Sequence, residues 1–238
     1  MRFKDRKVLV TGGSRGIGKA IADLFVGEGA NVTLTRRESN PIPDSTYKKV
    51  VSVDFNHAES VDGFIEFIQG CQWDICVNNA GINIIKPLAE TSFEDFDKVM
   101  KVDLYAPFRI SQAIAPGMVS RQWGRIVNIS SIWSVVTKSG RMSYTSAKSG
   151  LVGMTKTLAV ELSKDNVIVN SVSPGFTMTD LTRASLSKAE IETISASIPI
   201  GRFAESSEIA ELVLFMCSEQ NTYIVGQNII ADGGFVNV

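Results

Sequence analysis

Short apolar runs alternate with helix-like segments along the whole chain. The first run, KVLVT at 7–11, is β-branched and almost wholly apolar, as is typical of a strand buried on both faces of a sheet. From Gly16 the apolar residues follow helical spacing, and GEGA at 27–30 ends that helix through glycine. Later apolar runs predict six further strands, at 31–35, 48–54, 73–79, 125–130, 167–173 and 228–232.

Helical segments lie between most of these runs, near 59–69, 92–121, 142–164 and 205–219. This alternation predicts an α/β fold, in which a parallel sheet with right-handed crossovers carries helices on both faces. In such sheets ligands bind beyond the carboxyl ends of the strands, at the point where the strand order reverses. The sequence contains no internal repeat and no long linker.

The composition excludes several classes of protein. Hydrophobic residues make up 44% of the 238, enough for a sizeable core, and a net charge of −1 offers no basic surface for nucleic acid. No apolar run is long enough for a signal peptide at the N-terminus or for a membrane span elsewhere. We predict a soluble, cytoplasmic protein that binds neither nucleic acid nor membrane.

The cysteines and the single histidine do not form a recognisable metal or nucleophile site. Cys71, Cys76 and Cys217 form no CxxC motif, and we expect them to be buried, reduced thiols. His57 lies where a helix begins, which favours a turn or capping role over catalysis. One histidine excludes a metal site built from several, and we predict no metal.

A glycine-rich segment, TGGSRGIG at 11–18, directly follows the first strand and opens the first helix. Its critical glycines are Gly12, Gly16 and Gly18, in the spacing GxxxGxG. Such a loop lets the backbone approach a pyrophosphate, and the helix N-terminus supplies free N–H groups and a positive dipole end. The strand before it and the helix after it favour a dinucleotide site over a merely tight turn.

Arginines stand at the end of the second strand, where NAD-binding folds of this type usually carry an acid. A guanidinium, as in Arg36 or Arg37, pairs with a 2′-phosphate that a carboxylate would repel. Arg15, inside the glycine loop, could reach the same phosphate from the other side. The arginines favour NADP over NAD, and solvated surface charges are the alternative.

The segment SYTSAKSG at 143–150 places Tyr144 four residues before Lys148, so that both side chains share one face of a helix. A free phenol has a pKa of about 10, too high for proton exchange at neutral pH, and a neighbouring ammonium stabilises the phenolate. The pair therefore predicts general acid–base chemistry, although this spacing alone also occurs by chance on many helices.

Four motifs in order resemble those of the short-chain dehydrogenases/reductases: TGGSRGIG, then NNAG at 78–81, YTSAK at 144–148 and PGFTMT at 174–179. The resemblance covers essentially the whole chain. It implies a single Rossmann-type, doubly wound domain over 1–238 with a seven-stranded parallel sheet. It also implies NAD(P)(H)-dependent interconversion of alcohols and carbonyls, in a homotetramer or homodimer.

The resemblance implies a role for each motif residue. Tyr144 is the implied general acid or base, Lys148 its partner and a ligand of the nicotinamide ribose, and Ser131 the residue that orients the substrate oxygen. Ser131 is preferred over Ser130 because it lies thirteen residues before Tyr144, the usual interval of the family. Asp103 is implied as a fourth catalytic member.

The implied cofactor site gathers the glycine loop, the strand ends and the segment after 173. Asp54 would accept a hydrogen bond from the adenine amino group, and Thr179 would bind the nicotinamide carboxamide beside the Thr177 backbone. The full implied set is Gly12, Ser14, Arg15, Gly16, Ile17, Gly18, Arg36, Arg37, Asp54, Asn79, Ala80, Gly81, Tyr144, Lys148, Pro174, Gly175, Thr177 and Thr179.

Two segments depart from the family pattern. Asp103 stands where the family usually has an asparagine that holds a water between the lysine and solvent, and its charge would favour a protonated Lys148. A structural role at a helix break is the alternative for this residue. Between the second and third strands, ESNPIPDSTYKK is too short and too rich in proline for a helix, which predicts a loop beside the adenine end.

The substrate is the least determined part. Residues 176–200 predict a short helical lid, and the length and residue pattern of this segment resemble those of the 3-oxoacyl–acyl carrier protein reductases. Five residues are candidates for apolar pocket walls or for simple core: Ile82, Ile84, Ile85, Trp133 and Met178. We predict an NADP(H)-dependent oxidoreductase for a small carbonyl or alcohol, with a 3-oxoacyl thioester as one candidate. A sugar, polyol or steroid dehydrogenase and a non-catalytic dinucleotide-binding regulatory protein are the alternatives.

Overall fold

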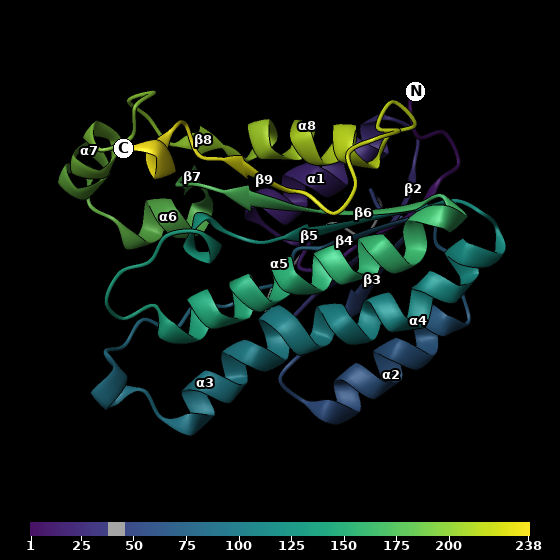
Figure 1. The fold of residues 1–238 in the computed structure, drawn as a ribbon, viewed down its shortest axis with the longest axis horizontal. Coiled ribbons are helices and arrows are strands. Elements are labelled where there is room, and N and C mark those ends of the chain that lie inside the picture. Colours follow the sequence, from purple (N-terminus) through teal and green to yellow (C-terminus); the bar gives the residue numbers. More distant parts are fainter. Residues whose placement is uncertain (38–45) are drawn as a thin grey trace.

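Seven parallel strands form one sheet in the computed structural model, which describes residues 1–37 and 46–238 (Figure 1). The strand order is β3-β2-β1-β4-β5-β6-β9, so the order reverses between β1 and β4. The strands are β1 (Lys7–Val10), β2 (Asn31–Arg36), β3 (Lys49–Ser52), β4 (Ile75–Asn78), β5 (Gly124–Ile129), β6 (Val167–Pro174) and β9 (Asn228–Ala231). The predicted α/β fold, a single Rossmann-type domain, is confirmed.

Helices cover both faces of this sheet (Figure 1). On one face α1 (Gly16–Gly27) packs beside α8 (Ser206–Cys217), and on the other lie α2 (Ala58–Gln69), α4 (Ala106–Ser120) and α5 (Met142–Leu162). Each layer has its own apolar core against the strands. Within the described part of the chain, no helix has the length and apolar character needed to cross a membrane.

The strands are apolar because both of their faces are covered. Ile75 and Val77 in β4 are completely buried in the core under one helical layer, and Cys76 between them is completely buried in the core under the other. Burying an aliphatic side chain of this size contributes about 1.5–3 kcal/mol. All seven predicted strands are present, with ends within two residues of the predicted ones.

The predicted helix near 92–121 is two helices. A turn of π-helix at Lys101–Tyr105 separates α3 (Phe93–Met100) from α4. Asp103 lies in this turn and is completely buried. Because a π-turn inserts an extra residue into the helix, it shifts the side chains on either side to new faces, and such turns are frequent at functional sites. Asp103 therefore does sit at a break in the helix.

Other sequence-based expectations need correction or lie outside the described residues. Cys71 is exposed, because it follows the end of α2 in a surface turn, whereas Cys76 and Cys217 are buried as expected. Of the predicted loop between the second and third strands, over 38–49, residues 38–45 lie outside the described residues. The region 176–200 holds two short helices, α6 (Asp180–Ser185) and α7 (Lys188–Ala196), rather than one. A small parallel pair of strands, β7 (Thr177–Met178) and β8 (Ala204–Glu205), flanks them and was not predicted.

A buried chain of hydrogen bonds ties α5 to the sheet. The Asn78 amide donates to the Asn128 side chain of the neighbouring strand (2.8 Å), and Asn128 donates to the Thr155 hydroxyl on α5 (2.9 Å). Thr155 in turn donates to the Leu151 carbonyl (2.8 Å). All three polar side chains are almost completely buried. Since an unmade bond here would leave a desolvated polar group, the chain fixes the position of α5 over the strand ends.

We expect Thr155→Val to destabilise the fold by about 1–3 kcal/mol, because it leaves the buried Asn128 amide without its acceptor. Urea unfolding at neutral pH measures this change. Ser111→Ala on α4 is the matched control, since the Ser111 hydroxyl is also buried but has no hydrogen-bond partner among the described residues. Its cost should stay within about 0.5 kcal/mol, and equal losses in the two variants would contradict the role of Thr155.

Candidate active site

The glycine loop is held against the strand ends by three polar side chains. Thr11 accepts hydrogen bonds from the backbone N–H groups of Asn79 and Ala80, both at 3.0 Å. Thr35 accepts from the Gly12 N–H (3.0 Å), and the Asn79 side chain donates to the Gly12 carbonyl (3.0 Å). The loops after β1, β2 and β4 therefore form one hydrogen-bonded unit.

Two glycines of this loop are required for different reasons. Gly16 has a φ of +55°, a left-handed conformation that side chains disfavour. Gly18 has an ordinary backbone, but a Cβ there would lie 2.3 Å from both the Asn79 amide nitrogen and the Gly12 carbonyl oxygen. In the predicted GxxxGxG motif, Gly16 is therefore required by its backbone conformation and Gly18 by the close packing around it.

The first turn of α1 has no side-chain cap. Its N-cap residue is Arg15, which has no acceptor to offer and makes no capping hydrogen bond. In contrast, Ser92 caps α3 and Ser187 caps α7 through capping boxes. The uncapped N–H groups and the positive end of the helix dipole suit an anion.

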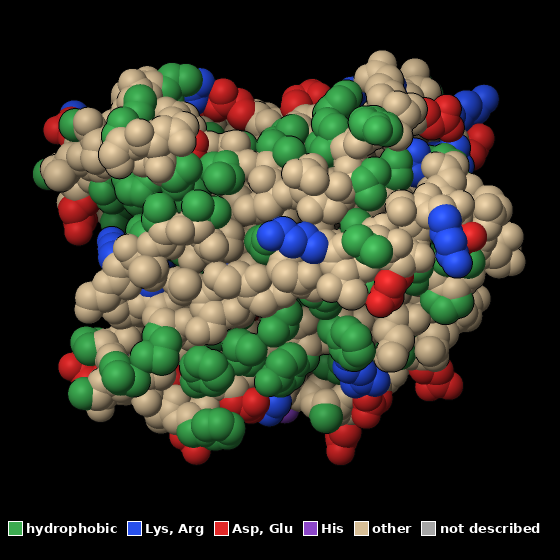
Figure 2. Space-filling model, viewed as in Figure 1, with side chains coloured by type: hydrophobic (Ala, Val, Ile, Leu, Met, Phe, Trp, Pro, Cys, Tyr) green, Lys and Arg blue, Asp and Glu red, His purple; other side chains and the backbone are tan. Residues whose placement is uncertain are grey.

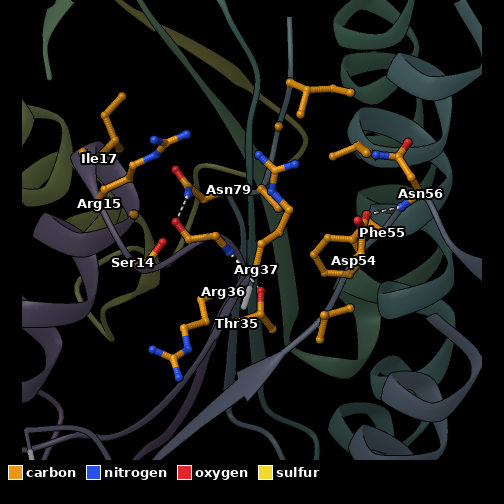
Figure 3. A pocket seen from close by; sticks show the side chains of 18 of the residues that line it. Ser14, Arg15, Ile17, Thr35, Arg36, Arg37, Asp54, Phe55, Asn56 and Asn79 are labelled. Carbon is orange, nitrogen blue, oxygen red and sulfur yellow. Dashed lines mark hydrogen bonds between the residues drawn. The ribbon is translucent and has the colours of Figure 1, made fainter. Parts of the chain in front are cut away.

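A cleft runs from this helix start across the ends of β2, β3 and β4 (Figure 3). Thirteen residues of the predicted set line it: Gly12, Ser14, Arg15, Gly16, Ile17, Gly18, Arg36, Arg37, Asp54, Asn79, Ala80, Gly81 and Thr179. The predicted pocket wall Ile82 also lines the cleft. Sequence reasoning missed five further lining residues, which carry no motif of their own: Thr35, Val53, Phe55, Asn56 and Val102. The other five residues of the predicted cofactor set are not among the lining residues: Tyr144, Lys148, Pro174, Gly175 and Thr177.

Three arginines from two elements line the cleft. Arg15 comes from the start of α1, and Arg36 and Arg37 come from the end of β2. In Figure 3 the side chains of Arg15 and Arg37 extend in the same direction, and Arg36 extends the opposite way. The structure therefore brings Arg15 and Arg37, which are 22 residues apart in the sequence, to one cleft with their side chains in the same direction.

Asp54 forms the far wall of the cleft, opposite Arg15 (Figure 3). One of its carboxylate oxygens accepts from the Asn56 N–H (2.9 Å), and its own N–H donates to the Ser60 hydroxyl (2.9 Å). His57 occupies the N-cap position of α2 without a capping side-chain bond, and its ring nitrogen lies 3.8 Å from the second Asp54 oxygen. His57 is thus a helix-start residue, as predicted, and does not reach the cleft lining.

Lys148 is buried beneath Tyr144 on α5. Its ammonium donates to the Ile129 carbonyl at the end of β5 (2.9 Å) and lies 5.6 Å from the centre of the Tyr144 ring. This distance confirms the prediction that the two side chains share one face of the helix. Only 4% of the Lys148 side chain is exposed, so its charge needs a partner within the protein.

The partner of Lys148 is Asp103. The carboxylate oxygen Oδ2 lies 3.2 Å from the Lys148 Nζ, and Oδ1 accepts from the Ile82 N–H (2.8 Å). Burial lowers the pKa of Lys148, but the Asp103 carboxylate and the Tyr144 oxygen outweigh burial and leave that pKa raised. Burial also raises the pKa of Asp103, with the ammonium acting against it. Asp103 thus stands at a helix break and also contacts the lysine, and its catalytic role stays a prediction.

The two serines after β5 have different surroundings. The Ser131 hydroxyl accepts from the Trp133 N–H (3.3 Å) at the start of a short 3₁₀ turn. The Ser130 hydroxyl instead donates to the Lys148 carbonyl on α5 (3.2 Å). Ser130 is therefore committed to holding α5, while the Ser131 hydroxyl proton has no such acceptor in the described part of the chain.

The segment after β6 meets the glycine loop. Thr179 caps α6 through its hydroxyl, which accepts from the Thr182 N–H (3.1 Å). A Cβ on Gly16 would lie 3.3 Å from the Thr179 methyl group, so the two segments touch. Thr177, which lies in β7, donates its hydroxyl to the Gly175 carbonyl (3.2 Å) and shapes the turn below.

The predicted pocket walls divide between cleft, core and surface. Ile82 lines the cleft, Ile85 is exposed, and Trp133 is buried. Trp133 packs edge-on against Phe176, with ring centres 6.3 Å apart, and Phe176 packs against Phe203 and Phe235. This aromatic cluster, Trp133 with Phe176, Phe203 and Phe235, was missed because its members are dispersed through the sequence.

Comparisons with known proteins agree on one family. A family model described as Enoyl-(Acyl carrier protein) reductase matches residues 12–236. The 3-oxoacyl-[acyl-carrier-protein] reductase of Aquifex aeolicus is 38% identical, over 98% of this chain and 98% of its own length. A solved structure described as a short chain dehydrogenase/reductase family protein covers 99% of this chain and 100% of its own, with 31% identity and a TM-score of 0.89.

A second solved structure is similar over the same range. It comes from Agrobacterium tumefaciens, is provisionally described as a 2-deoxy-D-gluconate 3-dehydrogenase, and contains bound NADP. It is 33% identical with a TM-score of 0.89, and covers 99% of this chain and 98% of its own. The relatives thus share a fold and a class of chemistry while their named substrates differ.

The ion pair predicts a pH-dependent cost of removing the lysine. Lys148→Met deletes the main charge that opposes burial of Asp103, so the pKa of Asp103 rises further above its unfolded value. A carboxyl group with a raised folded pKa costs no stability below its unfolded pKa, about 3.9, and its cost grows as pH rises from that value to the folded pKa, above which it stays constant. We expect a loss of about 3–5 kcal/mol at pH 8 and a smaller loss at pH 5.

Urea unfolding of both proteins at the two pH values measures this difference. Lys164→Met is the matched control, because Lys164 is exposed in the turn after α5. It should change stability little at either pH. A loss in Lys148→Met that is the same at pH 5 and pH 8 would mean that Asp103 is not the group left unpaired.

Proposed function

The chain belongs to the short-chain dehydrogenase/reductase family and is an oxidoreductase, and from this premise we propose that it interconverts a carbonyl and a secondary alcohol with NADP(H). Tyr144 exchanges the proton. The observation that carries the proposal is the buried Lys148–Asp103 pair, one helical turn from Tyr144 and beside the cleft. A Cβ on the cleft residue Gly81 would lie 3.0 Å from Asp103 and 3.5 Å from Lys148, so the pair adjoins the cleft wall.

The residues of the cleft fit a phosphorylated dinucleotide. The uncapped first turn of α1 offers N–H groups to a pyrophosphate, and the space beside Gly16 and Gly18 has no room for larger side chains. Arg15, Arg36 and Arg37 supply positive charge suited to a 2′-phosphate, and Asp54 offers an acceptor for an adenine amino group. When bound, the nicotinamide ring supplies or accepts the hydride.

Tyr144 donates its proton to the substrate oxygen during reduction and takes it back during oxidation. The Lys148 ammonium, 5.6 Å from the ring centre, stabilises the negative charge that develops on the phenol oxygen. Asp103 keeps this ammonium protonated in spite of its burial. A neutral asparagine at this position would hold the lysine by a hydrogen bond but would not offset its charge.

Ser131 orients the substrate. Its hydroxyl accepts from the Trp133 N–H, which leaves the hydroxyl proton to be donated to a carbonyl oxygen. A donor aimed at an oxygen favours carbonyl reduction over reduction of a carbon–carbon double bond. The two short helices α6 and α7, within 176–200, act as the substrate lid and stand at the end of the molecule where α5 begins (Figure 1).

Two classes of substrate have specific support. The sequence relatives are 3-oxoacyl-[acyl-carrier-protein] reductases, which favours a 3-oxoacyl thioester. The solved structure with bound NADP is provisionally described as acting on a deoxygluconate, which favours a hydroxy acid of the sugar type. Both classes present a secondary alcohol or its carbonyl to Tyr144, so the proton-transfer chemistry is the same.

Tyr144→Phe tests the proposal. The phenol oxygen is the only atom removed, so turnover with a panel of carbonyl substrates and NADPH should fall at least about 100-fold, while NADPH affinity changes little. Initial rates from NADPH absorbance and a fluorescence titration measure the two properties. Tyr223→Phe is the matched control, because Tyr223 is 95% exposed. Wild-type protein that binds NADPH but reduces no carbonyl would support the non-catalytic, regulatory alternative.

The arginines predict the choice of cofactor. Arg15→Gln and Arg37→Gln should each weaken NADPH binding by about tenfold or more, through a lost charge-assisted contact, and leave NADH binding within about twofold. Titrations with both nucleotides measure the ratio. Arg109→Gln is the control, since Arg109 pairs with Asp62 on the surface, 2.7 Å away. Equal losses for NADPH and NADH would assign the arginines a general role in stabilising the loop.

We also propose that the protein is a homo-oligomer, a tetramer or a dimer, that associates through the face of α4 and α5. Several large apolar side chains are exposed near this face, including Phe93, Tyr105, Phe108 and Val160. Figure 2 shows hydrophobic side chains gathered over α3 and α4. Sedimentation equilibrium would give a multiple of the 25.8 kDa chain mass, and a monomer would contradict the proposal.

A further inference from the structure

We infer that Arg141 binds a carboxylate of the substrate, so that the reacting alcohol or carbonyl belongs to a hydroxy or oxo acid. The inference rests on the proposed oxidoreductase function and names the substrate class of the same site. It chooses between the two classes considered above. Three features of Arg141 support the inference: its position near Tyr144, the lack of an acidic partner among the described residues and its contact with the Trp133 ring.

Arg141 lies beside the residues that handle the substrate oxygen. It is the N-cap residue of α5 and precedes Tyr144 by three residues, about 4.5 Å along a helix axis. Its guanidinium carbon is 5.1 Å from the centre of the Trp133 ring, and the Trp133 N–H donates to Ser131. Arg141 thus connects the Tyr144 end of α5 with the Ser131 turn.

The guanidinium of Arg141 has no acidic partner among the described residues. Its Nε is buried without a hydrogen bond, and burial lowers the pKa of the group, with Tyr144 acting in the opposite direction. Four other arginines are paired with carboxylates: Arg2 with Glu28, Arg6 with Glu219, Arg109 with Asp62 and Arg202 with Glu208. Arg125, whose Nε is also buried without a hydrogen bond, donates from its terminal nitrogen to the Gly124 and Asn166 carbonyls, whereas no such bond is made by Arg141 to a described residue. A partly desolvated cation without a counter-ion is costly to keep, so an external anion is its natural partner.

A second cation strengthens the positive charge at this place. The Lys138 ammonium lies 5.5 Å from the centre of the same Trp133 ring, and no ion pair involves Lys138 in the described part of the chain. Trp133 therefore carries two cations, from the loop that leads into α5. This loop stands at the same end of the molecule as α6 and α7 (Figure 1).

The Trp133 ring holds the Arg141 guanidinium in a position suited to a planar anion. Trp133 is 9% exposed and packs edge-on against Phe176, so the position of the ring that the guanidinium contacts is fixed. A guanidinium held against an aromatic surface loses less freedom when it binds, and it can present two parallel N–H donors to a carboxylate. A carboxylate bound there would lie a few bonds from an oxygen held by Tyr144 and Ser131.

This arrangement disfavours a 3-oxoacyl thioester. The acyl chain and the thioester are neutral, and the phosphate of a carrier arm is many bonds away from the reacting carbonyl. A hydroxy or oxo acid instead carries its charge close to the reacting carbon. Arg141 therefore favours a small acid, oxidised or reduced at a carbon near its carboxylate.

The test compares acids with neutral analogues of the same shape. Three pairs serve as probes: D-gluconate with D-glucitol, 3-hydroxybutanoate with butane-1,3-diol, and acetoacetate with its ethyl ester. Calorimetry in unreactive combinations, the alcohols with NADPH-loaded protein and the oxo compounds with NADP⁺-loaded protein, measures binding without turnover. Nucleotide absorbance in the reactive combinations measures turnover. We expect at least one acid to bind about tenfold to 100-fold more tightly than its neutral analogue.

Variants assign this preference to Arg141. Arg141→Gln should remove the difference between acid and analogue while the affinity for the neutral analogue changes less than about threefold, and Arg141→Lys should restore part of it. Arg109→Gln, a matched change at a distant surface pair, should leave the preference intact. Thermal unfolding of each variant establishes that the fold is kept, since a purely structural role would lower stability without separating acids from neutral compounds.

The outcomes separate the inference from the proposed function. If no acid binds more tightly than its neutral partner, or if Arg141→Gln keeps the preference, the carboxylate site is wrong. Turnover of neutral carbonyls or of acetoacetyl thioester in preference to every acid would also overturn it, and would leave the oxidoreductase function in place. Arg141-dependent binding of an acid without any turnover would support the anion site and contradict the proposed function.

Discussion

The buried ion pair between Lys148 and Asp103 is the contact on which the rest of the site depends. Each group alone would cost several kcal/mol to remove from water, and their attraction is useful only with further hydrogen bonds. Those bonds exist, because the ammonium also donates to Ile129 and the carboxylate also accepts from Ile82. The pair therefore joins α5, the π-turn after α3, the end of β5 and the loop after β4 into one rigid unit.

The same unit sets the geometry around Tyr144. Helix α5 is held at a second place by the buried bonds of Asn78, Asn128 and Thr155, two turns further along. With two fixed points on the sheet, the helix has little freedom to slide or rotate, and the phenol keeps its place above the lysine. The π-turn has a clear purpose in this arrangement, since it brings the Asp103 carboxylate into a position fully buried beside the Lys148 ammonium.

The positive groups around the cleft are arranged differently from this buried ion pair. There the first turn of α1 has no side-chain cap, and Arg15 and Arg37 make no ion pair with a described residue. Arg141 repeats this pattern at the opposite end of the site, on the ring of Trp133.

Much of this protein was determined by the sequence alone. A strand buried on both faces must be apolar, and a helix over a sheet must be apolar on one side, so periodicity located all seven strands and most helices. The glycine loop and the Tyr144–Lys148 spacing could also be predicted, because each is set by the local backbone. The loop needs a left-handed residue and a close approach of two segments, and the Tyr144–Lys148 pair needs one turn of helix.

Tertiary structure alone decided which distant groups meet. Asp103 and Lys148 are 45 residues apart, and nothing local in either segment indicates that the two charges neutralise each other. The same holds for Arg141 on Trp133, for the aromatic cluster and for the exposure of Cys71, which depends on where a turn ends. The physical reason is that periodicity specifies which face of an element is buried, whereas the packing of whole elements specifies what that face touches.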